Sequence, residues 1–172
     1  MALEIERRFL VSGQAWRQHQ RWSAALEQGY LSREPEGLTL RVRRDGKGAA
    51  WLTLKLPAAG IARQEFEYAI PPTDAAALLA QCPVALGKVR HGLDLPGGDW
   101  VLDVFSAENA PLVIAEVELE RADQALPIPP WCCAEITGLG AFSNAALAAN
   151  PFARWSTAER EPWLMHLQPQ PS

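Results

Sequence analysis

Like-charged residues spaced two apart recur along this chain, and their side chains are the ones best suited to chemistry. Carboxylates bind divalent cations, whereas guanidinium and ammonium groups bind phosphate oxygens. If the two sets converge, they form a site for a polyphosphate chain accompanied by a divalent cation. The acidic residues are Glu4, Glu6, Glu65, Glu67, Asp103, Glu116 and Glu118, and the basic residues are Arg8, Arg41, Arg43, Lys55, Lys88 and Arg90.

These residues lie in stretches where apolar and polar residues alternate, which is typical of strands with two unlike faces. Residues two apart on a strand project from the same face, roughly 6.5–7 Å from one another. The stretches are 3–11, 38–43, 52–56, 65–70, 88–91, 100–105, 113–120 and 134–137, with a hairpin turn at 45–48. They predict a sheet of about eight strands.

Few helices are expected. The expected helices are 74–81, capped by Thr73, and 144–149, capped by Ser143. Residues 14–21 are a weaker candidate for a helix. We expect residues 1–155 to form the domain. The proline-containing stretch 156–172 is expected to be a C-terminal tail, with some apolar residues that could dock on the domain.

A sheet of this size, with one charged and one apolar face, can close into a barrel with either face inward. Charges on the outside would be ordinary solubilising groups. Charges on the inside would require a hydrated and occupied lumen, because each uncompensated buried ion costs several kcal/mol. The alternation by itself leaves both arrangements open.

Composition narrows the class of protein. The 172 residues are 48% hydrophobic and 21% charged, which is typical of one globular domain, and the net charge of −4 gives no overall attraction to nucleic acid or anionic membranes. Cys82, Cys132 and Cys133 fit neither a disulfide framework nor a zinc site and favour a reduced, cytoplasmic location. The charged opening of the chain is not expected to be a signal peptide. The run 136–153 is uncharged but contains Gly, Asn and Pro, so it is not expected to span a membrane.

The first strand, Glu4-Ile5-Glu6-Arg7-Arg8, resembles the ExExK opening of the CYTH superfamily, the triphosphate tunnel metalloenzymes. Further motifs follow in the family's order and extend the similarity over residues 2–149. They are Gln28-Gly29-Tyr30-Leu31, Leu40-Arg41-Val42-Arg43, Thr53-Leu54-Lys55, Arg63-Gln64-Glu65-Phe66-Glu67, Lys88-Val89-Arg90, Leu102-Asp103-Val104-Phe105 and Glu116-Val117-Glu118-Leu119. The chain is similar to the short bacterial members, which are inorganic triphosphatases.

The resemblance implies a mainly β (α+β) fold: a closed antiparallel eight-stranded β-barrel with a few peripheral helices. Its tunnel would be open at both ends and lined by the charged side chains. The implied activity is divalent-metal-dependent hydrolysis of inorganic tripolyphosphate, releasing phosphate, with Mg²⁺ or Mn²⁺ as the cofactor. The implied partner is a small polyphosphate, not nucleic acid or a membrane, and an apolar outer face is compatible with a homodimer.

The resemblance also implies roles for individual residues. The phosphate-binding residues would be Arg8, Arg41, Arg43, Lys55, Lys88 and Arg90. The metal-binding residues would be Glu4, Glu6, Asp103, Glu116 and Glu118. The catalytic residues would be Lys88, Glu65 and Tyr30, with Tyr30 orienting the substrate.

Two departures from the family pattern bear on activity. Arg8 stands where ExExK has Lys, and its guanidinium is bulkier and fork-shaped. The stretch 138–144 carries no charge, although family members often have basic residues and a Tyr there. Thiamine triphosphatase or adenylate cyclase activity on the same fold, and a non-catalytic polyphosphate-binding module, stay open as alternatives.

Overall fold

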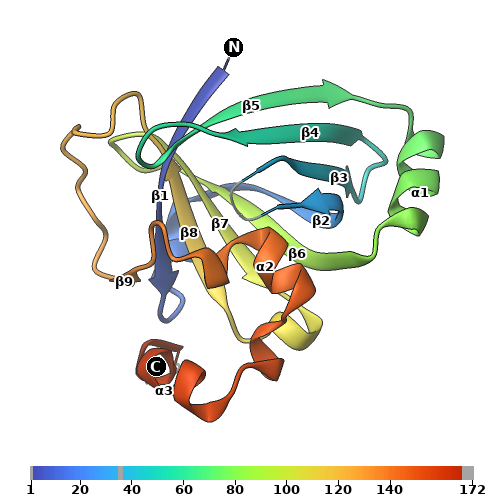
Figure 1. Ribbon diagram of the computed structural model, residues 1–172. Coiled ribbons are helices and arrows are strands. Elements are labelled where there is room, and N and C mark those ends of the chain that lie inside the picture. Colours follow the sequence, from blue (N-terminus) through green and yellow to red (C-terminus); the bar gives the residue numbers. More distant parts are fainter. Residues whose placement is uncertain (1, 35–36, 168–172) are drawn as a thin grey trace.

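The computed structural model describes residues 2–34 and 37–167, and most of its regular structure is antiparallel strand (Figure 1). The strands are β1 (Ala2–Val11), β2 (Gln20–Arg33), β3 (Thr39–Asp45), β4 (Ala50–Pro57), β5 (Ala62–Ala69), β6 (Val84–Leu93), β7 (Asp99–Phe105), β8 (Val113–Glu118) and β9 (Cys132–Glu135). The helices are α1 (Pro72–Gln81), α2 (Asn144–Ala149) and α3 (Thr157–Leu167), with short 3-10 helices η1 (Ala15–His19), η2 (Ala107–Asn109), η3 (Gly140–Phe142) and η4 (Phe152–Arg154).

The sheet closes on itself through β1. One edge of β1 pairs with β8, and the other edge pairs first with β5 and further along with β9. The order β5-β4-β3-β2-β6-β7-β8-β1 therefore forms a ring, which surrounds the interior in Figure 1. The predicted closed antiparallel eight-stranded barrel is confirmed for the described residues, with β9 as an added short strand.

The strand β2 is the barrel strand that the alternation did not predict. Its first four residues are all exposed, so no apolar face marks its beginning. The weaker helix prediction at 14–21 is wrong at its end, because η1 stops at His19 and β2 begins at Gln20. The expected strand at 134–137 corresponds to β9, which lies outside the ring of eight.

Both other expected helices are present. The helix α2 begins after Ser143, whose Oγ accepts a hydrogen bond from the Ala146 backbone N–H at 3.1 Å, as expected of a capping residue. The helix α1 begins at Pro72 and not after a Thr73 cap. That cap prediction is wrong because proline is well suited to the first helical position, where its missing N–H costs nothing.

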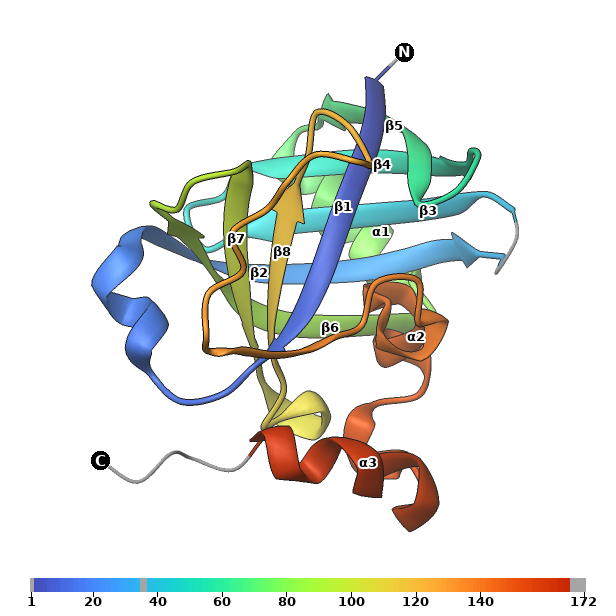
Figure 2. The ribbon, with the colours of Figure 1, turned by 90° about the vertical axis from the view of Figure 1, so that its left-hand side faces the viewer.

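Helices and loops cover parts of the outer apolar face of the barrel. The helix α1 packs Ala75 against Val42 and Ala50. Around β1, β7 and β8, a larger outer cluster includes Trp16 of η1 and Trp131. The connection between β8 and β9 crosses in front of β1 and β8 (Figure 2). Much of the apolar strand face is therefore covered from the outside, although Leu3, Tyr68 and Val89 stay exposed, and the opposite, polar face is toward the interior.

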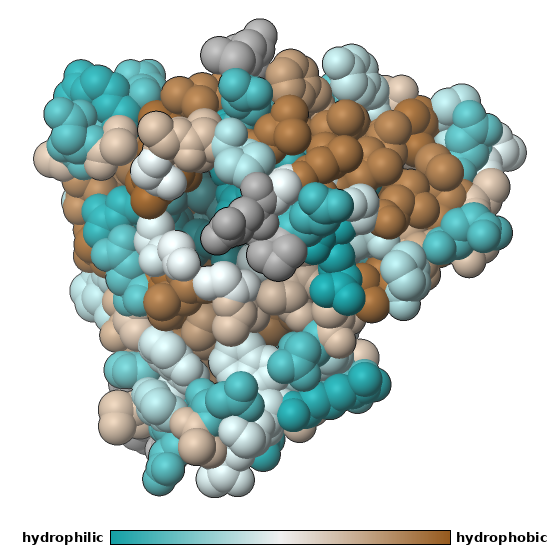
Figure 3. Space-filling view, in the orientation of Figure 1, coloured by the Kyte–Doolittle hydropathy of each residue, from teal (hydrophilic) through white to brown (hydrophobic). Residues whose placement is uncertain are grey.

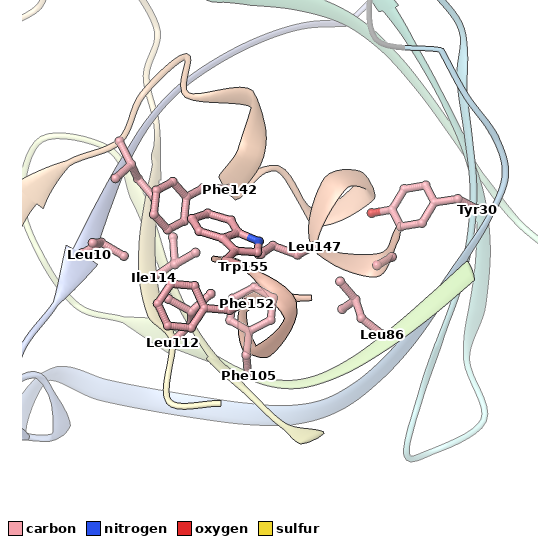
Figure 4. Close-up of a cluster of buried hydrophobic side chains, with 12 residues drawn as sticks. Leu10, Tyr30, Leu86, Phe105, Leu112, Ile114, Phe142, Leu147, Phe152 and Trp155 are labelled. Carbon is pink, nitrogen blue, oxygen red and sulfur yellow. The ribbon is translucent and has the colours of Figure 1, made fainter. Parts of the chain in front are cut away.

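A different apolar cluster fills one end of the interior. Leu10, Leu86 and Phe105 meet Phe142 of η3 and Leu147 of α2, and the ring of strands surrounds them (Figure 4). Each of the three strand residues is two positions from a charged residue on the same face of its strand. The interior is therefore apolar near α2 and charged further along the same strands.

The stretch expected to be a tail contains the helix α3. The ring of Trp163 packs edge-on against Phe142, with 5.1 Å between ring centroids, so this apolar residue docks on the interior cluster. Residues 168–172 of the expected tail lie outside the described residues, and the division at residue 155 stays a prediction. In the part of the chain that is described, no helix has the length and apolar character needed to cross a membrane.

Replacing Leu147 with Ala is expected to lower the free energy of unfolding by about 2–5 kcal/mol. Leu147 is fully buried in the interior cluster, so the truncation leaves a cavity between α2 and the barrel. The control is Leu139→Ala, because Leu139 is 42% exposed and its truncation creates no enclosed cavity. Denaturant unfolding followed by tryptophan fluorescence measures both variants, and equal effects would contradict this account of the core.

Candidate active site

Charged side chains line the interior next to the apolar cluster. Five predicted site residues are buried although they carry charge: Arg8, Arg41, Lys88, Asp103 and Glu116, each at most 8% exposed. Such residues are almost never buried unless they are paired. The charged faces of the strands therefore point inward, as the resemblance implied. The arrangement in which they serve only to solubilise the exterior is excluded.

Lys88, Arg90 and Asp103 form an ion-paired cluster across β6 and β7. Lys88 Nζ donates to Asp103 Oδ2 at 2.5 Å, and Arg90 donates through Nε and Nη2 to both carboxylate oxygens at 2.8 Å. The sheet register produces this fork, because Arg90 lies directly opposite Asp103. Burial alone would raise the pKa of Asp103, but the charges of Arg90 and Lys88 outweigh it and hold that pKa below its ordinary value.

Lys88 is fully enclosed in this cluster. Its Nζ also donates to Asn144 Oδ1 of α2 at 3.1 Å, and none of its side chain is exposed. Burial and then the charge of Arg90 lower the pKa of Lys88 to about 7. Lys88 therefore links α2 to the barrel wall and has no surface left with which to touch a ligand in this arrangement.

Glu116 links the same cluster to Arg8 on β1. Arg90 Nη2 lies 3.3 Å from one of its oxygens and Arg8 Nη2 lies 3.5 Å from the other. Burial opposes ionisation, but Arg90 and Arg8 hold the pKa of Glu116 well below its ordinary value. Arg8 Nη1 also donates to the backbone oxygen of Phe142 at 2.9 Å. The guanidinium that replaces the family lysine thus ties the uncharged stretch 138–144 to β1.

A second cluster surrounds Lys55 on β4. Its Nζ lies 2.6 Å from Glu4 and 3.0 Å from Glu65. Burial raises the pKa of Glu4 to about 7 against the opposing charge of Lys55. The pKa of Glu6 is also raised, by burial and by the nearby charge of Glu116. Acidic groups therefore outnumber their cationic partners on this side of the interior.

The two arginines of β3 are held differently. Arg41 Nη2 donates to Thr53 Oγ1 at 3.0 Å and lies 3.3 Å from the partly exposed carboxylate of Glu67. Arg43 Nε donates to the amide oxygen of Gln28 at 3.2 Å, and no carboxylate of the described chain lies within ion-pair distance of it. Burial and the charges of neighbouring arginines lower the pKa of Arg43 to about 9.

Three neutral residues belong to this site although the charge pattern did not predict them. Gln28, Thr53 and Asn144 each hydrogen-bond an interior cation. Gln28 and Thr53 share the inward face of their strands with Tyr30 and Lys55, so strand parity could have identified them. No signal in the sequence marked Asn144, because its contact depends on where α2 docks.

A cavity of about 600 Å³ opens beside these clusters. Inward residues of β1 to β4 and the stretch 137–146 form its wall, among them Arg8, Tyr30, Arg41, Lys55, Leu139 and Ser143. Figure 3 shows hydrophilic residues recessed near the middle of this face. The buried apolar cluster lies beside this cavity, near α2, and the expectation of a tunnel open at both ends stays a prediction.

Tyr30 lies where the cavity meets the apolar cluster. Its ring belongs to that cluster and is only 3% exposed, while its hydroxyl oxygen accepts a hydrogen bond from Gln28 Nε2 at 2.7 Å. Tyr30 also lines the cavity. The structure therefore places this predicted catalytic residue at the inner wall and not at the rim of the barrel.

The carboxylates predicted to bind metal do not meet at a single point. Among the described residues, no three acidic, histidine or cysteine side chains are arranged to hold an ion. Glu118 is exposed at the end of β8, and burial and nearby acids raise its pKa. The oxygen donors nevertheless suit Mg²⁺ or Mn²⁺. Since Mg²⁺ keeps several waters and commonly uses one or two carboxylates plus substrate phosphates, the donors fit a cation that binds together with its substrate.

Comparison with known proteins decides the family. The family model described as the CYTH domain matches residues 2–143, which is most of the chain. The chain belongs to the CYTH family. The prediction made from the strand motifs is thus confirmed. This CYTH protein departs from the family pattern at Arg8 and in the uncharged stretch 138–144. The hydrogen bond from Arg8 to the backbone oxygen of Phe142 connects these two places.

This CYTH protein has relatives of known activity. An inorganic triphosphatase of Acetivibrio thermocellus is 36% identical over 156 residues, covering 88% of this chain and 97% of the relative. An inorganic triphosphatase of Nitrosomonas europaea is 37% identical over 152 residues, covering 84% and 96%. The crystal structure of the inorganic triphosphatase NE1496 superposes with a TM-score of 0.61 at 35% identity, covering 84% of this chain and 97% of that one.

Proposed function

We propose that this CYTH protein hydrolyses inorganic tripolyphosphate with release of phosphate, in a reaction that depends on a divalent cation. The observation that carries the proposal is a cation-lined interior that opens into a cavity of about 600 Å³. A linear polyanion would supply the negative charge that such a lining attracts. The names of the two bacterial relatives support the same substrate.

Five basic side chains are proposed to bind the phosphates. Arg8, Arg41 and Lys55 line the cavity, and Arg8 and Arg41 each have a buried Nε that lacks a hydrogen-bond partner among the described residues. A buried donor without a partner is costly, so these N–H groups are suited to phosphate oxygens. Arg43 and Arg90 complete the set further along the interior, whereas Lys88, which the resemblance placed in it, is fully buried and bonded to Asp103 and Asn144.

The cation is proposed to be held by Glu4, Glu6, Glu116 and Glu118. When bound, a divalent cation neutralises negative charge on the phosphate oxygens. Asp103, which the resemblance placed among the metal ligands, already accepts hydrogen bonds from Lys88 and Arg90. We therefore propose that its main task is to orient these two cations.

Three residues are proposed to assist hydrolysis. Glu65 and its neighbour Glu4 share Lys55, and a carboxylate of this pair is suited to accept the proton of the attacking water. Tyr30 would donate its hydroxyl hydrogen to a phosphate oxygen and align the chain. Lys88 would act through Asp103, because its own side chain is fully buried.

Purified protein is expected to release phosphate from tripolyphosphate in the presence of Mg²⁺ or Mn²⁺, and to lose this activity when EDTA removes the cation. ATP and thiamine triphosphate are tested in parallel, with phosphate, pyrophosphate and cyclic AMP measured. Cyclic AMP, or faster turnover of thiamine triphosphate, would replace the proposal with one of the organic-substrate activities. Tight binding of tripolyphosphate without turnover would replace it with a binding module.

The setting proposed for this activity is the cytoplasm, with a small polyphosphate as the partner. The three cysteines are free thiols in the described chain, which suits a reducing compartment. The net charge of −4 disfavours nucleic acid and anionic membrane surfaces as alternatives. A homodimer through the apolar outer face stays a prediction, which sedimentation of the purified protein would test.

A further inference from the structure

We propose that Gln28 is a positioning residue for phosphate binding, which orients the Arg43 guanidinium and the Tyr30 hydroxyl so that both donate toward a polyanion in the interior. This inference deepens the proposed function and rests on it. Gln28 is neutral and lies among the charged clusters, and none of the roles assigned above involves it.

Gln28 lies between its two partners on the inner wall of the barrel and is 0% exposed. Its Oε1 accepts a hydrogen bond from Arg43 Nε at 3.2 Å, and its Nε2 donates to the Tyr30 hydroxyl at 2.7 Å. The register of β2 and β3 places Gln28 directly opposite Arg43, and Tyr30 follows two positions later on the same face. The sheet itself, and not a loop, therefore fixes this network.

Only one orientation of the Gln28 amide satisfies both neighbours. A guanidinium has donors and no acceptor, so the amide oxygen must face Arg43. The amide NH₂ group then faces Tyr30, whose oxygen must act as the acceptor. The hydroxyl hydrogen of Tyr30 is consequently left to donate elsewhere, and Tyr30 lines the cavity. Gln28 thus turns the Tyr30 donor toward the space that a phosphate would occupy.

A neutral partner also leaves the charge of Arg43 available. Arg41, Lys55, Lys88 and Arg90 are each within ion-pair distance of a carboxylate, whereas Arg43 is held by the Gln28 amide. A glutamate at position 28 would have nearly the same shape but the opposite effect. Its carboxylate would pair with Arg43 and would also accept the hydroxyl hydrogen of Tyr30. The role therefore requires an amide at this position.

The test compares Gln28→Glu with Gln64→Glu. Both variants add one negative charge, but Gln64 lies on β5 next to the inward Glu65 in sequence and so on the opposite, outer face of that strand. KM and kcat are measured with tripolyphosphate and Mg²⁺, and Kd is measured by calorimetry with tripolyphosphate in EDTA. Gln28→Glu should raise KM and Kd by about 10-fold or more. Gln64→Glu should leave both constants unchanged.

Two further variants separate positioning from a structural role. Gln28→Met removes both hydrogen bonds without adding charge and should also raise KM, so it serves as the test if Gln28→Glu does not fold. In a Tyr30→Phe background, Gln28→Glu should raise KM by a smaller factor, because one of the two donors that it would capture is gone. A merely structural role would lower the melting temperature and the active fraction while KM and Kd stayed the same.

The outcomes for the two proposals are distinct. If wild-type protein hydrolyses tripolyphosphate and folded Gln28→Glu or Gln28→Met keeps the wild-type KM and Kd, the positioning role of Gln28 is wrong and the proposed function stands. If wild-type protein neither binds nor hydrolyses tripolyphosphate, the proposed function is wrong and the role of Gln28 is wrong with it.

Discussion

Asp103→Asn is expected to lower the free energy of unfolding by about 3–5 kcal/mol, the range for removal of one partner from a buried ion pair. Asp103 is fully buried and accepts hydrogen bonds from both Lys88 and Arg90. Without the carboxylate, Lys88 can lose its proton, because burial already holds its pKa at about 7. Arg90 cannot lose its proton. Its buried guanidinium is then left with Glu116 as its carboxylate partner in the described chain.

Thermal unfolding measures this effect. For a domain of this size 1 kcal/mol corresponds to roughly 2–4 °C, so the melting temperature should fall by about 10 °C. Asp94→Asn is the matched control, because Asp94 pairs with Arg21 on the exposed surface and this pair adds little to stability. Similar melting temperatures for Asp103→Asn and the wild-type protein would show that the Asp103 carboxylate does not stabilise the interior.

Glu118→Gln is expected to reduce Mg²⁺-dependent turnover of tripolyphosphate by about 100-fold or more. Even the loss of a residue that only hydrogen-bonds a metal ligand typically lowers metal affinity or activity by about 10–100-fold. Glu118 shares the inward face of β8 with Glu116 but is exposed and makes no ion pair within the described chain. Its replacement should therefore leave the melting temperature unchanged. Glu116→Gln should also abolish turnover, but it disturbs Arg8 and Arg90 as well.

Steady-state rates over a range of Mg²⁺ concentrations measure the effect of Glu118→Gln, and calorimetry in EDTA measures tripolyphosphate binding without the cation. Binding in EDTA should be retained or strengthened, because one negative charge near the substrate is removed. Glu120→Gln is the control, as it removes the same charge from an exposed position past the end of β8. Unchanged turnover in Glu118→Gln would remove Glu118 from the proposed metal ligands.

Much of the barrel could be predicted from the chain, because strand alternation is a local property. Residues two apart share a face whatever the rest of the molecule does, so Glu116 and Glu118 were assigned to one side correctly. The cap of α2 at Ser143 was equally local. The strand β2 was missed since its exposed beginning has no apolar face, although its Gln28–Leu31 segment carries a family motif.

Which charged residues share a face, and which family the motifs belong to, follow from the spacing of residues along the chain. Which charges neutralise one another, and which stay available, depends on the folded barrel. Asp103 is taken up by Lys88 and Arg90, whereas Arg43 meets an amide. These partners come from neighbouring strands, and from the docking of α2 in the case of Asn144. The strength of an electrostatic contact depends on distance and burial across the barrel, and neither quantity follows from the order of residues.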